Sequence, residues 1–338
     1  MQNYKKNRKF ILIISFLIIL LFFIFIISFN IGTFAISPLD VIKTLFGQGN
    51  RKQELVLFTM RFPRIIIAIL VASALAISGT VLQGITKNDL ADPGILGITS
   101  GAALAVVIYI YFMSGNAYTQ ISKLTIFTMP LVALVGAGFG AFLIYTLAYK
   151  KGLDPTRLIL MGIGINSAFN AILIIFQLRF TTQEFNKVMV WTSGSIWGTN
   201  WSYVLATLPW VFIFTGLIIY KARYLDVLNL GDELAVGLGV HIEKQRRILI
   251  IYTVALAGAA TAVAGTISFL GLVAPHIARR LVGPKHKLLI PTSALVSSII
   301  LLLSDTIAKN LLAPIEIPVG IIVSIIGVPY FIYLIMKE

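Results

Sequence analysis

The chain has 338 residues, of which 58% are hydrophobic and only 12% are charged. Soluble domains carry roughly 25% charged residues, so this composition, with a mean hydropathy of +0.94, excludes an ordinary soluble protein. The formal net charge is +14. In a membrane protein, basic residues report the sidedness of loops before anything else, so we expect no nucleic-acid partner. No cysteine is present, which excludes disulfides and thiolate metal sites.

The first predicted element is an apolar run over residues 10–29 that follows Lys5, Lys6, Arg8 and Lys9. It is too long for the apolar region of a signal peptide, so we expect an uncleaved first span in the membrane lipid. Nine further stretches are continuously apolar rather than alternating, which predicts an all-α, polytopic membrane protein of ten transmembrane helices and not a barrel. They cover residues 63–82, 95–113, 124–148, 158–178, 201–220, 247–269, 271–283, 288–308 and 317–336.

The basic residues predict the orientation of these spans. With both ends in the cytoplasm, eighteen Lys and Arg residues fall inside and nine outside, which is the asymmetry expected for an N-in, C-in chain. Five of the nine external ones lie within residues 43–64. Either this stretch is a solvated loop with incidental charges, or a partner outside the cell requires positive charge there.

The longest predicted cytoplasmic connection covers residues 221–247 of an otherwise single transmembrane domain, residues 1–338. Within it, residues 232–240 are predicted to form a short helix that begins with Asp232 as an acidic N-cap and ends at Gly239. Such an element is either a docking helix for a cytosolic partner or only a turn.

Several kinds of chemistry are missing from the sequence. No phosphate-binding G-x-x-x-x-G-K-[ST] pattern occurs, so any ATP that drives this protein is expected on another subunit. The three histidines are far apart and have no partner at ligand spacing, so we expect neither a metal site nor a cofactor. Asp305 is the one acidic residue inside a predicted span, which argues against an ion-coupled transporter.

Polar residues without charge interrupt some apolar runs. Asn166 and Asn170 are four residues apart and share one helical face. An uncharged polar stripe suits the passage of a large polar solute better than an ion site, although most such residues only join neighbouring helices. The glycine pairs at Gly97 and Gly101 and at Gly136 and Gly140 are interpreted as helix-packing positions.

At this point the motifs resemble a known family, the FecCD-type permeases of ABC importers for iron-siderophores, haem and vitamin B12. The similarity covers about residues 35–336. The motifs that carry it are Arg61-x-Pro63-Arg64, Gly79-x-x-x-Gln83, Asn88-x-Leu90-Ala91-Asp92-Pro93, Leu160-x-Gly162-x-x-x-Asn166, Trp191-x-x-Gly194-Ser195, Gly231-x-x-x-Ala235-x-x-Leu238-Gly239, Phe269-x-Gly271-Leu272-x-x-Pro275-His276-x-x-Arg279 and Glu316-x-Pro318-x-Gly320.

The resemblance implies a vitamin-B12-permease-like half of ten spans in the cytoplasmic membrane. It also implies the partners: a second permease subunit, identical or paralogous, a cytosolic ABC ATPase dimer, and an extracellular substrate-binding lipoprotein. The substrate it favours is an iron(III)-siderophore, as in Gram-positive relatives, with vitamin B12 or haem as the alternative. The chain itself is then a transport subunit and not an enzyme.

The resemblance also assigns roles to residues. Arg61, Arg64 and Lys309 are expected to meet acidic residues of the binding protein, although Lys309 lacks the fork of the arginine common at this position. Two further sets complete the expected sites: for the translocation path Gln83, Asn88, Thr156, Asn166 and Asn170, and for ATPase coupling Gly231, Ala235, Leu238 and Gly239.

Two other classes of function remain open at this stage. An ion-coupled secondary transporter would take up solute in membranes energised only by an ion gradient, because a sodium site can be built from backbone carbonyls at broken helices. A membrane anchor for a cytosolic partner would bind that partner through residues 221–247 without moving any solute.

Overall fold

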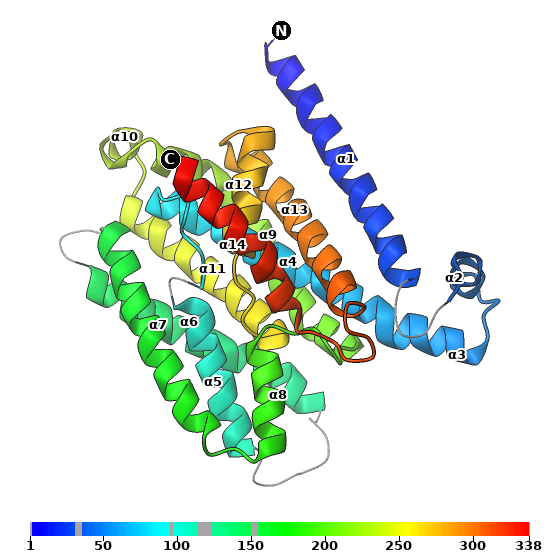
Figure 1. The fold of residues 1–338 in the computed structure, drawn as a ribbon. Helices are drawn as coiled ribbons and strands as arrows, with labels where there is room; N and C mark the ends of the chain where they lie inside the picture. Colours follow the sequence, from blue (N-terminus) through cyan, green and yellow to red (C-terminus); the bar gives the residue numbers. More distant parts are fainter. Residues whose placement is uncertain (1, 31–35, 95–96, 114–122, 150–154, 338) are drawn as a thin grey trace.

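The structure, a computed structural model, describes residues 2–30, 36–94, 97–113, 123–149 and 155–337, and in these residues it is built from helices without a β-strand (Figure 1). The elements in chain order are α1 (Gln2–Asn30), α2 (Pro38–Leu45), α3 (Arg51–Glu54), the π-helix η1 (Leu55–Arg61), α4 (Phe62–Thr86), α5 (Ile98–Met113), α6 (Lys123–Ala148), α7 (Pro155–Gln177), α8 (Thr182–Thr192), α9 (Trp201–Asn229), α10 (Asp232–Gly237), α11 (Ile242–Ala264), α12 (Leu270–Val282), α13 (His286–Ala308) and α14 (Val319–Lys337).

The expected all-α, polytopic fold is confirmed. Each of the ten predicted spans contains a helix, and eight of these helices are long and apolar enough to cross a membrane. The other two are shorter: α5 has an apolar core of Ile98–Phe112, and α12 has 13 residues. At two of the predicted crossings the described helix is therefore shorter than a full span.

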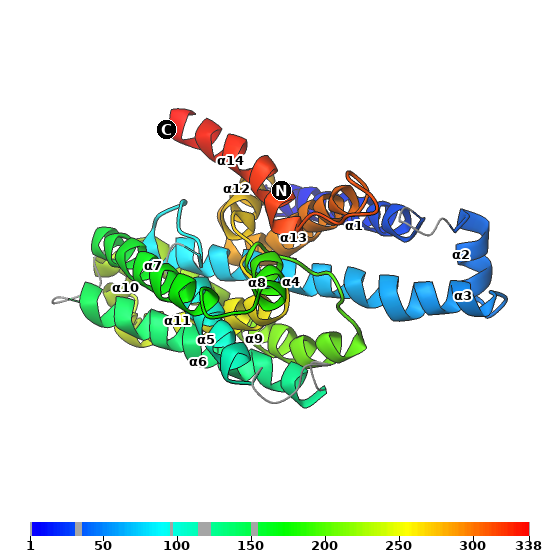
Figure 2. The same cartoon turned by 60° about the horizontal axis from the view of Figure 1, so that its bottom comes forward.

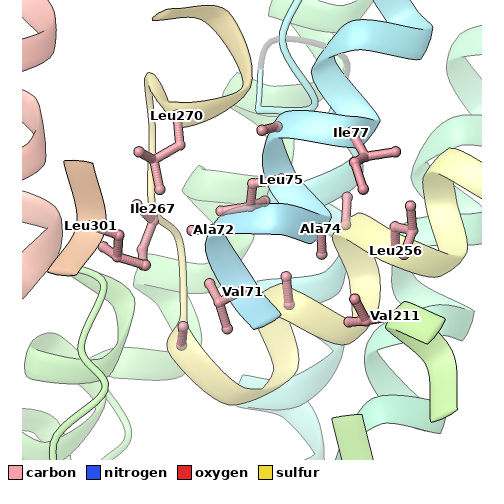
Figure 3. Packing of buried hydrophobic residues seen from close by; sticks show 14 of the residues in the cluster. Val71, Ala72, Ala74, Leu75, Ile77, Val211, Leu256, Ile267, Leu270 and Leu301 are labelled. Carbon is pink, nitrogen blue, oxygen red and sulfur yellow. The ribbon is translucent and has the colours of Figure 1, made fainter. Parts of the chain in front are cut away.

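Three helices form the centre of the bundle. In α4, α11 and α13, about two thirds or more of the most apolar stretch is buried inside the protein, against 11% for α1. Figure 3 shows the small and branched side chains of α4, such as Ala72 and Ala74, packed among Val211 of α9, Leu256 of α11 and Leu301 of α13. Small residues let these backbones approach closely, which is how helices associate in lipid without a hydrophobic driving force.

The packing interpretation of the glycine pairs is confirmed at the contact of α5 with α6. A Cβ atom added to Gly101 would overlap the carbonyl oxygen of Gly136, and one added to Gly136 would overlap that of Gly101. The two backbones are thus in direct contact, and any side chain at either position would force the helices apart.

Two views show how the periphery is arranged. The start of α1, the end of α14 and α10 lie at the end of the bundle away from α2 and α3 (Figures 1 and 2). This agrees with the prediction that both chain ends face one side. Helix α1 packs mainly against α13 and leans away from the rest of the bundle at its start.

The structure corrects the predicted connection at residues 221–247. Helix α9 continues to Asn229 and α11 begins at Ile242, so only residues 230–241 join them. Side chains within the predicted connection join the two helices: Lys221 Nζ of α9 donates to Gln245 Oε1 of α11 at 3.0 Å. Long basic side chains can extend from a helix end into the polar interface without ending the helix.

Candidate functional site

The three residues predicted to meet a binding protein come together at one end of the bundle. Arg61 and Arg64 lie on either side of the start of α4, and Lys309 caps the end of α13. Two acidic residues, Asp305 and Glu316, join them. We call these five residues the outer cluster, because the basic-residue distribution predicts that this end is external; with three basic and two acidic side chains, its net charge is +1.

Arg64 occupies the middle of the outer cluster. Its Nε and NH2 groups donate to Asp305 Oδ1 at 3.0 and 2.8 Å, and its NH1 group donates to Glu316 Oε2 at 2.8 Å. The Asp305 side chain is fully buried and the Arg64 side chain is 15% exposed. The guanidinium is therefore committed to carboxylates of its own chain, and an acid from outside has to compete with Glu316 for it.

The other two basic residues of the outer cluster hold the end of α1. The last carbonyl groups of a helix have no partner within the helix and carry partial negative charge. Lys309 Nζ donates to the Ser28 carbonyl and to Ser28 Oγ, both at 3.0 Å, and Arg61 donates to the Phe29 carbonyl. Burial lowers the pKa of Lys309 to about 8, against the opposing effect of Asp305.

Two of the residues predicted to line the path make contacts within the chain. Gln83 is fully buried: its Nε2 lies 3.4 Å from the carbonyl oxygen of Gly271 in α12, and its Oε1 accepts from Arg279 NH2 at 3.1 Å. Asn88 is half-buried and accepts from the Leu90 N–H at 2.8 Å, which stabilises a turn. In this arrangement Gln83 joins α4 to α12, and Asn88 shapes a loop.

The remaining path residues lie on α7. Asn166 Nδ2 donates to the Gly94 carbonyl at 3.2 Å, and Asn170, which is exposed, approaches Asn166 Oδ1 at 3.5 Å. The predicted polar stripe is therefore present on one face of α7. Thr156 lies exposed in the first turn of the same helix, so these three residues share an element while Gln83 and Asn88 do not.

Sequence reasoning missed a hollow beside α14. This open hollow has a volume of about 550 Å³ and is lined by Ser193, Thr266, Gly320, Ile321, Ser324, Ile325, Val328 and Pro329. Its walls are largely apolar, and three hydroxyl groups supply polarity without charge. The available signal was the presence of Ser324 and Thr266 within or beside apolar runs, but only the fold brings α14 next to the end of α8.

The segment predicted for ATPase coupling forms the short helix α10 at one end of the bundle (Figure 1). Within this segment Ala235 is fully buried, whereas the side chains of Leu234, Val236 and Leu238 are about 60% or more exposed. Gly231 and Gly239 flank the helix with positive φ angles of 115° and 77°, which only glycine adopts without strain. The segment therefore presents a small apolar surface to the solvent.

The predicted start of this helix was wrong in one respect. The N-cap is Gly231, which has no side chain to offer, and Asp232 is the first helical residue. The Asp232 carboxylate points elsewhere: its Oδ1 accepts from Lys87 Nζ and from Arg246 NH2, each at 2.9 Å. Burial tends to raise the pKa of Asp232, but the Lys87 hydrogen bond and the Arg246 charge outweigh it and lower the pKa.

These features can be compared with known proteins. The sequence matches the FecCD transport family over residues 19–337, almost its whole length. The chain belongs to the FecCD transport family. One relative in this family, the iron(3+)-hydroxamate import system permease protein FhuG of Bacillus subtilis, is 51% identical over 332 residues, which are 98% of each chain. The iron-uptake system permease protein FeuC of the same bacterium is 39% identical over 98% of each chain.

Other FecCD relatives and a solved structure agree with this assignment. The hemin transport system permease protein HmuU of Yersinia pestis is 36% identical and covers 97% of this chain and 96% of its own. A metal-chelate type ABC transporter in an inward-facing conformation superimposes with a TM-score of 0.82 at 31% identity, over 96% of this chain and 99% of that chain. This FecCD chain is therefore a multi-pass membrane protein and a transport subunit.

Proposed function

We propose that this protein is the permease subunit of an ABC importer that carries an iron(III)-siderophore of the hydroxamate class across the cytoplasmic membrane. The observation that carries the proposal is the 51% identity, over 98% of both chains, with an iron(3+)-hydroxamate permease. Relatives named for hemin or for Fe(3+)-citrate are 36% and 39% identical. Haem and citrate complexes are therefore the competing substrates that an experiment must separate from a hydroxamate.

The energy for transport is proposed to come from a separate ATPase dimer that binds α10. The exposed side chains of Leu234, Val236 and Leu238 support this, because a row of apolar groups on a short element in water is typical of a protein contact. The chain also lacks a P-loop sequence. In this arrangement α10 and both chain ends face the cytoplasm.

The outer cluster is proposed to receive the binding protein, and a second permease subunit is proposed to complete the path. The net positive charge of the outer cluster would steer an acidic partner. The exposed face of α7, with Asn166 and Asn170, and the hollow beside α14 are the proposed walls of the path, since both combine uncharged polar groups with apolar surface. Thr156 stays a prediction for the path, while Gln83 joins α4 to α12 and Asn88 stabilises a turn.

The test is uptake by proteoliposomes that hold the permease with its cognate permease partner, ATPase and binding protein. We expect ATP-dependent accumulation of a radioiron-labelled trihydroxamate siderophore, with excess unlabelled trihydroxamate competing and ferric citrate or haemin competing far less. The control vesicles hold this chain alone and should accumulate nothing. Stronger competition by haemin would reassign the substrate, and accumulation by the lone chain under an ion gradient would replace the ABC mechanism.

A further inference from the structure

The inference concerns how α10 is fastened to the rest of the protein. This helix has six residues, and its buried residue is Ala235. Two cations from different helices reach its first residue, Asp232: Lys87 from the end of α4, and Arg246 from the first turns of α11, whose NH2 lies 2.9 and 3.1 Å from the two carboxylate oxygens. One carboxylate therefore joins α10 to both α4 and α11.

The burial of Arg246 makes this joint strong. Its side chain is only 6% exposed, whereas those of Lys87 and Asp232 are 36% and 50% exposed. A mostly buried guanidinium needs an opposite charge, so separating Asp232 from Arg246 leaves a buried cation without its closest partner. The Lys87 arm is more solvated and is worth less.

The joint extends beyond α10. Arg246 lies 3.8 Å from Glu243 in the same helix, and Glu243 Oε2 accepts from Tyr145 Oη of α6 at 2.9 Å. Arg247 Nε also donates to Tyr145 Oη, at 3.3 Å. A connected set of polar contacts thus runs from α10 through α11 to α6. We call its members the inner network: Lys87, Tyr145, Asp232, Glu243, Arg246 and Arg247.

The neighbouring residue provides the contrast. Glu233 follows Asp232 on α10 and is exposed, and in the described part of the chain no ion pair to it is found. Both residues are acidic and both lie in the first turn of α10, so they contribute alike to its charge and to its dipole. Of these two acidic residues, only Asp232 forms ion pairs with other helices in the described part of the chain.

We propose that Asp232 is the positioning residue that transmits a displacement of α10 to α4 and α11. A partner that pushes on Leu234 and Leu238 moves the Asp232 carboxylate. The paired cations move with it, because separating Asp232 from Arg246 would leave the buried guanidinium without its closest counter-charge. Helices α4 and α11 are two of the three central helices, so motion delivered to them reaches the whole bundle. This inference rests on the proposed function, since the push is that of the ATPase.

The test compares Asp232→Asn with the matched variant Glu233→Gln in the complete reconstituted importer. Siderophore uptake and ATP hydrolysis are measured in the same vesicles. We expect the ratio of uptake to hydrolysis to fall by at least about fivefold in Asp232→Asn, the lower end of coupling between linked sites, while Glu233→Gln keeps the wild-type ratio. Asp232→Glu should recover much of the loss, because it restores the charge.

A second measurement covers the case in which Asp232→Asn assembles poorly. Lys87→Met removes the more solvated arm alone and should lower the ratio less than Asp232→Asn. Because the chain has no cysteine, a single Val236→Cys spin label reports α10 directly and should become more mobile in both variants. An unchanged ratio and an unchanged label overturn the role of Asp232 while uptake by the wild type continues; absence of ATP-driven uptake by the wild type overturns the proposed function instead.

Discussion

The outer cluster and the inner network are both built from ion pairs between basic side chains and carboxylates, but the burial of these pairs differs. In the outer cluster, Arg64 lies between Asp305 and Glu316, and the Asp305 side chain is fully buried. In the inner network, Asp232 is half exposed and only one of its two cations, Arg246, is buried. The outer charges are thus used to hold α1, α4 and α13 together, whereas the inner charges hold a small element that remains accessible.

The surroundings of the two regions also differ in what they offer a partner. Beside Asp232, the apolar side chains of α10 are exposed and available for contact. At the outer cluster, a docking carboxylate meets an arginine that is already paired. The comparison predicts that the proposed docking at α10 depends on apolar contact, and that the proposed docking at the outer cluster depends on a small excess of charge and on exchange with Glu316.

The largest expected effect comes from breaking the buried pair of the outer cluster. Asp305→Ala should lower the stability of the protein in detergent by about 3–5 kcal/mol, because Arg64 loses its buried counter-charge. Glu316→Gln, at the more exposed side of the same arginine, should cost about 1 kcal/mol or less. Thermal unfolding of the purified variants measures both, and equal losses would contradict the division between a buried and a solvated arm.

A double variant sharpens this prediction. Arg64→Ala with Asp305→Ala removes both members of the Arg64–Asp305 pair, so neither of these two charges is left buried without the other. The double variant should therefore lose less stability than the sum of the two single losses. Strict additivity would mean that the two side chains do not depend on each other.

The second effect concerns the apolar face of α10. Leu238→Asp should weaken binding of the ATPase by about 30-fold, the loss of about 2 kcal/mol typical of a central apolar contact. The matched control is Leu311→Asp after the end of α13, because Leu238 and Leu311 are 62% and 61% exposed. Affinity of the ATPase for nanodisc-embedded permease is the measurement. A similar loss in both variants would place the contact outside α10.

The smallest expected effect is a difference in pH dependence. Lys309, with a pKa lowered to about 8 by burial, is mostly charged at pH 7 and mostly neutral at pH 9, so the net charge of the outer cluster falls as pH rises. Affinity for the binding protein should therefore drop across this range by about threefold more than in Lys309→Arg, which stays charged.

The inner network supplies the internal control for this pH effect. The pKa of Asp232 is lowered below its ordinary value, so Asp232 is ionised throughout the same range and ATPase binding should not follow the loss of the Lys309 charge. Parallel curves for the wild type and Lys309→Arg would remove Lys309 from docking.

The long apolar helices could be predicted from the sequence because membrane spans depend on length and composition alone. Helices α2, α3 and α8 were not predicted, since they are short and all three carry charged residues that resemble a loop. Predicting the extension of α9 and α11 required the contact between Lys221 and Gln245, which joins different helices.

The candidate site could be predicted only in part, because its contacts join residues that are far apart along the chain. The resemblance placed Arg61, Arg64 and Lys309 in one role, but the partners of Arg64 lie 241 and 252 residues away along the chain. Polarity within an apolar run could not distinguish Gln83, which faces α12, from Asn170, which is exposed. Asp232 fitted an N-cap by residue type, and only the positions of Lys87 and Arg246 identify its role.

The attachment of α1 has an evolutionary consequence. Arg61 and Lys309 hold this helix through carbonyl oxygens of Phe29 and Ser28, and every amino acid supplies a carbonyl oxygen. Substitutions among the lipid-facing residues of α1 leave these bonds in place. We therefore expect the sequence of α1 to tolerate more substitutions than the two cations that secure it.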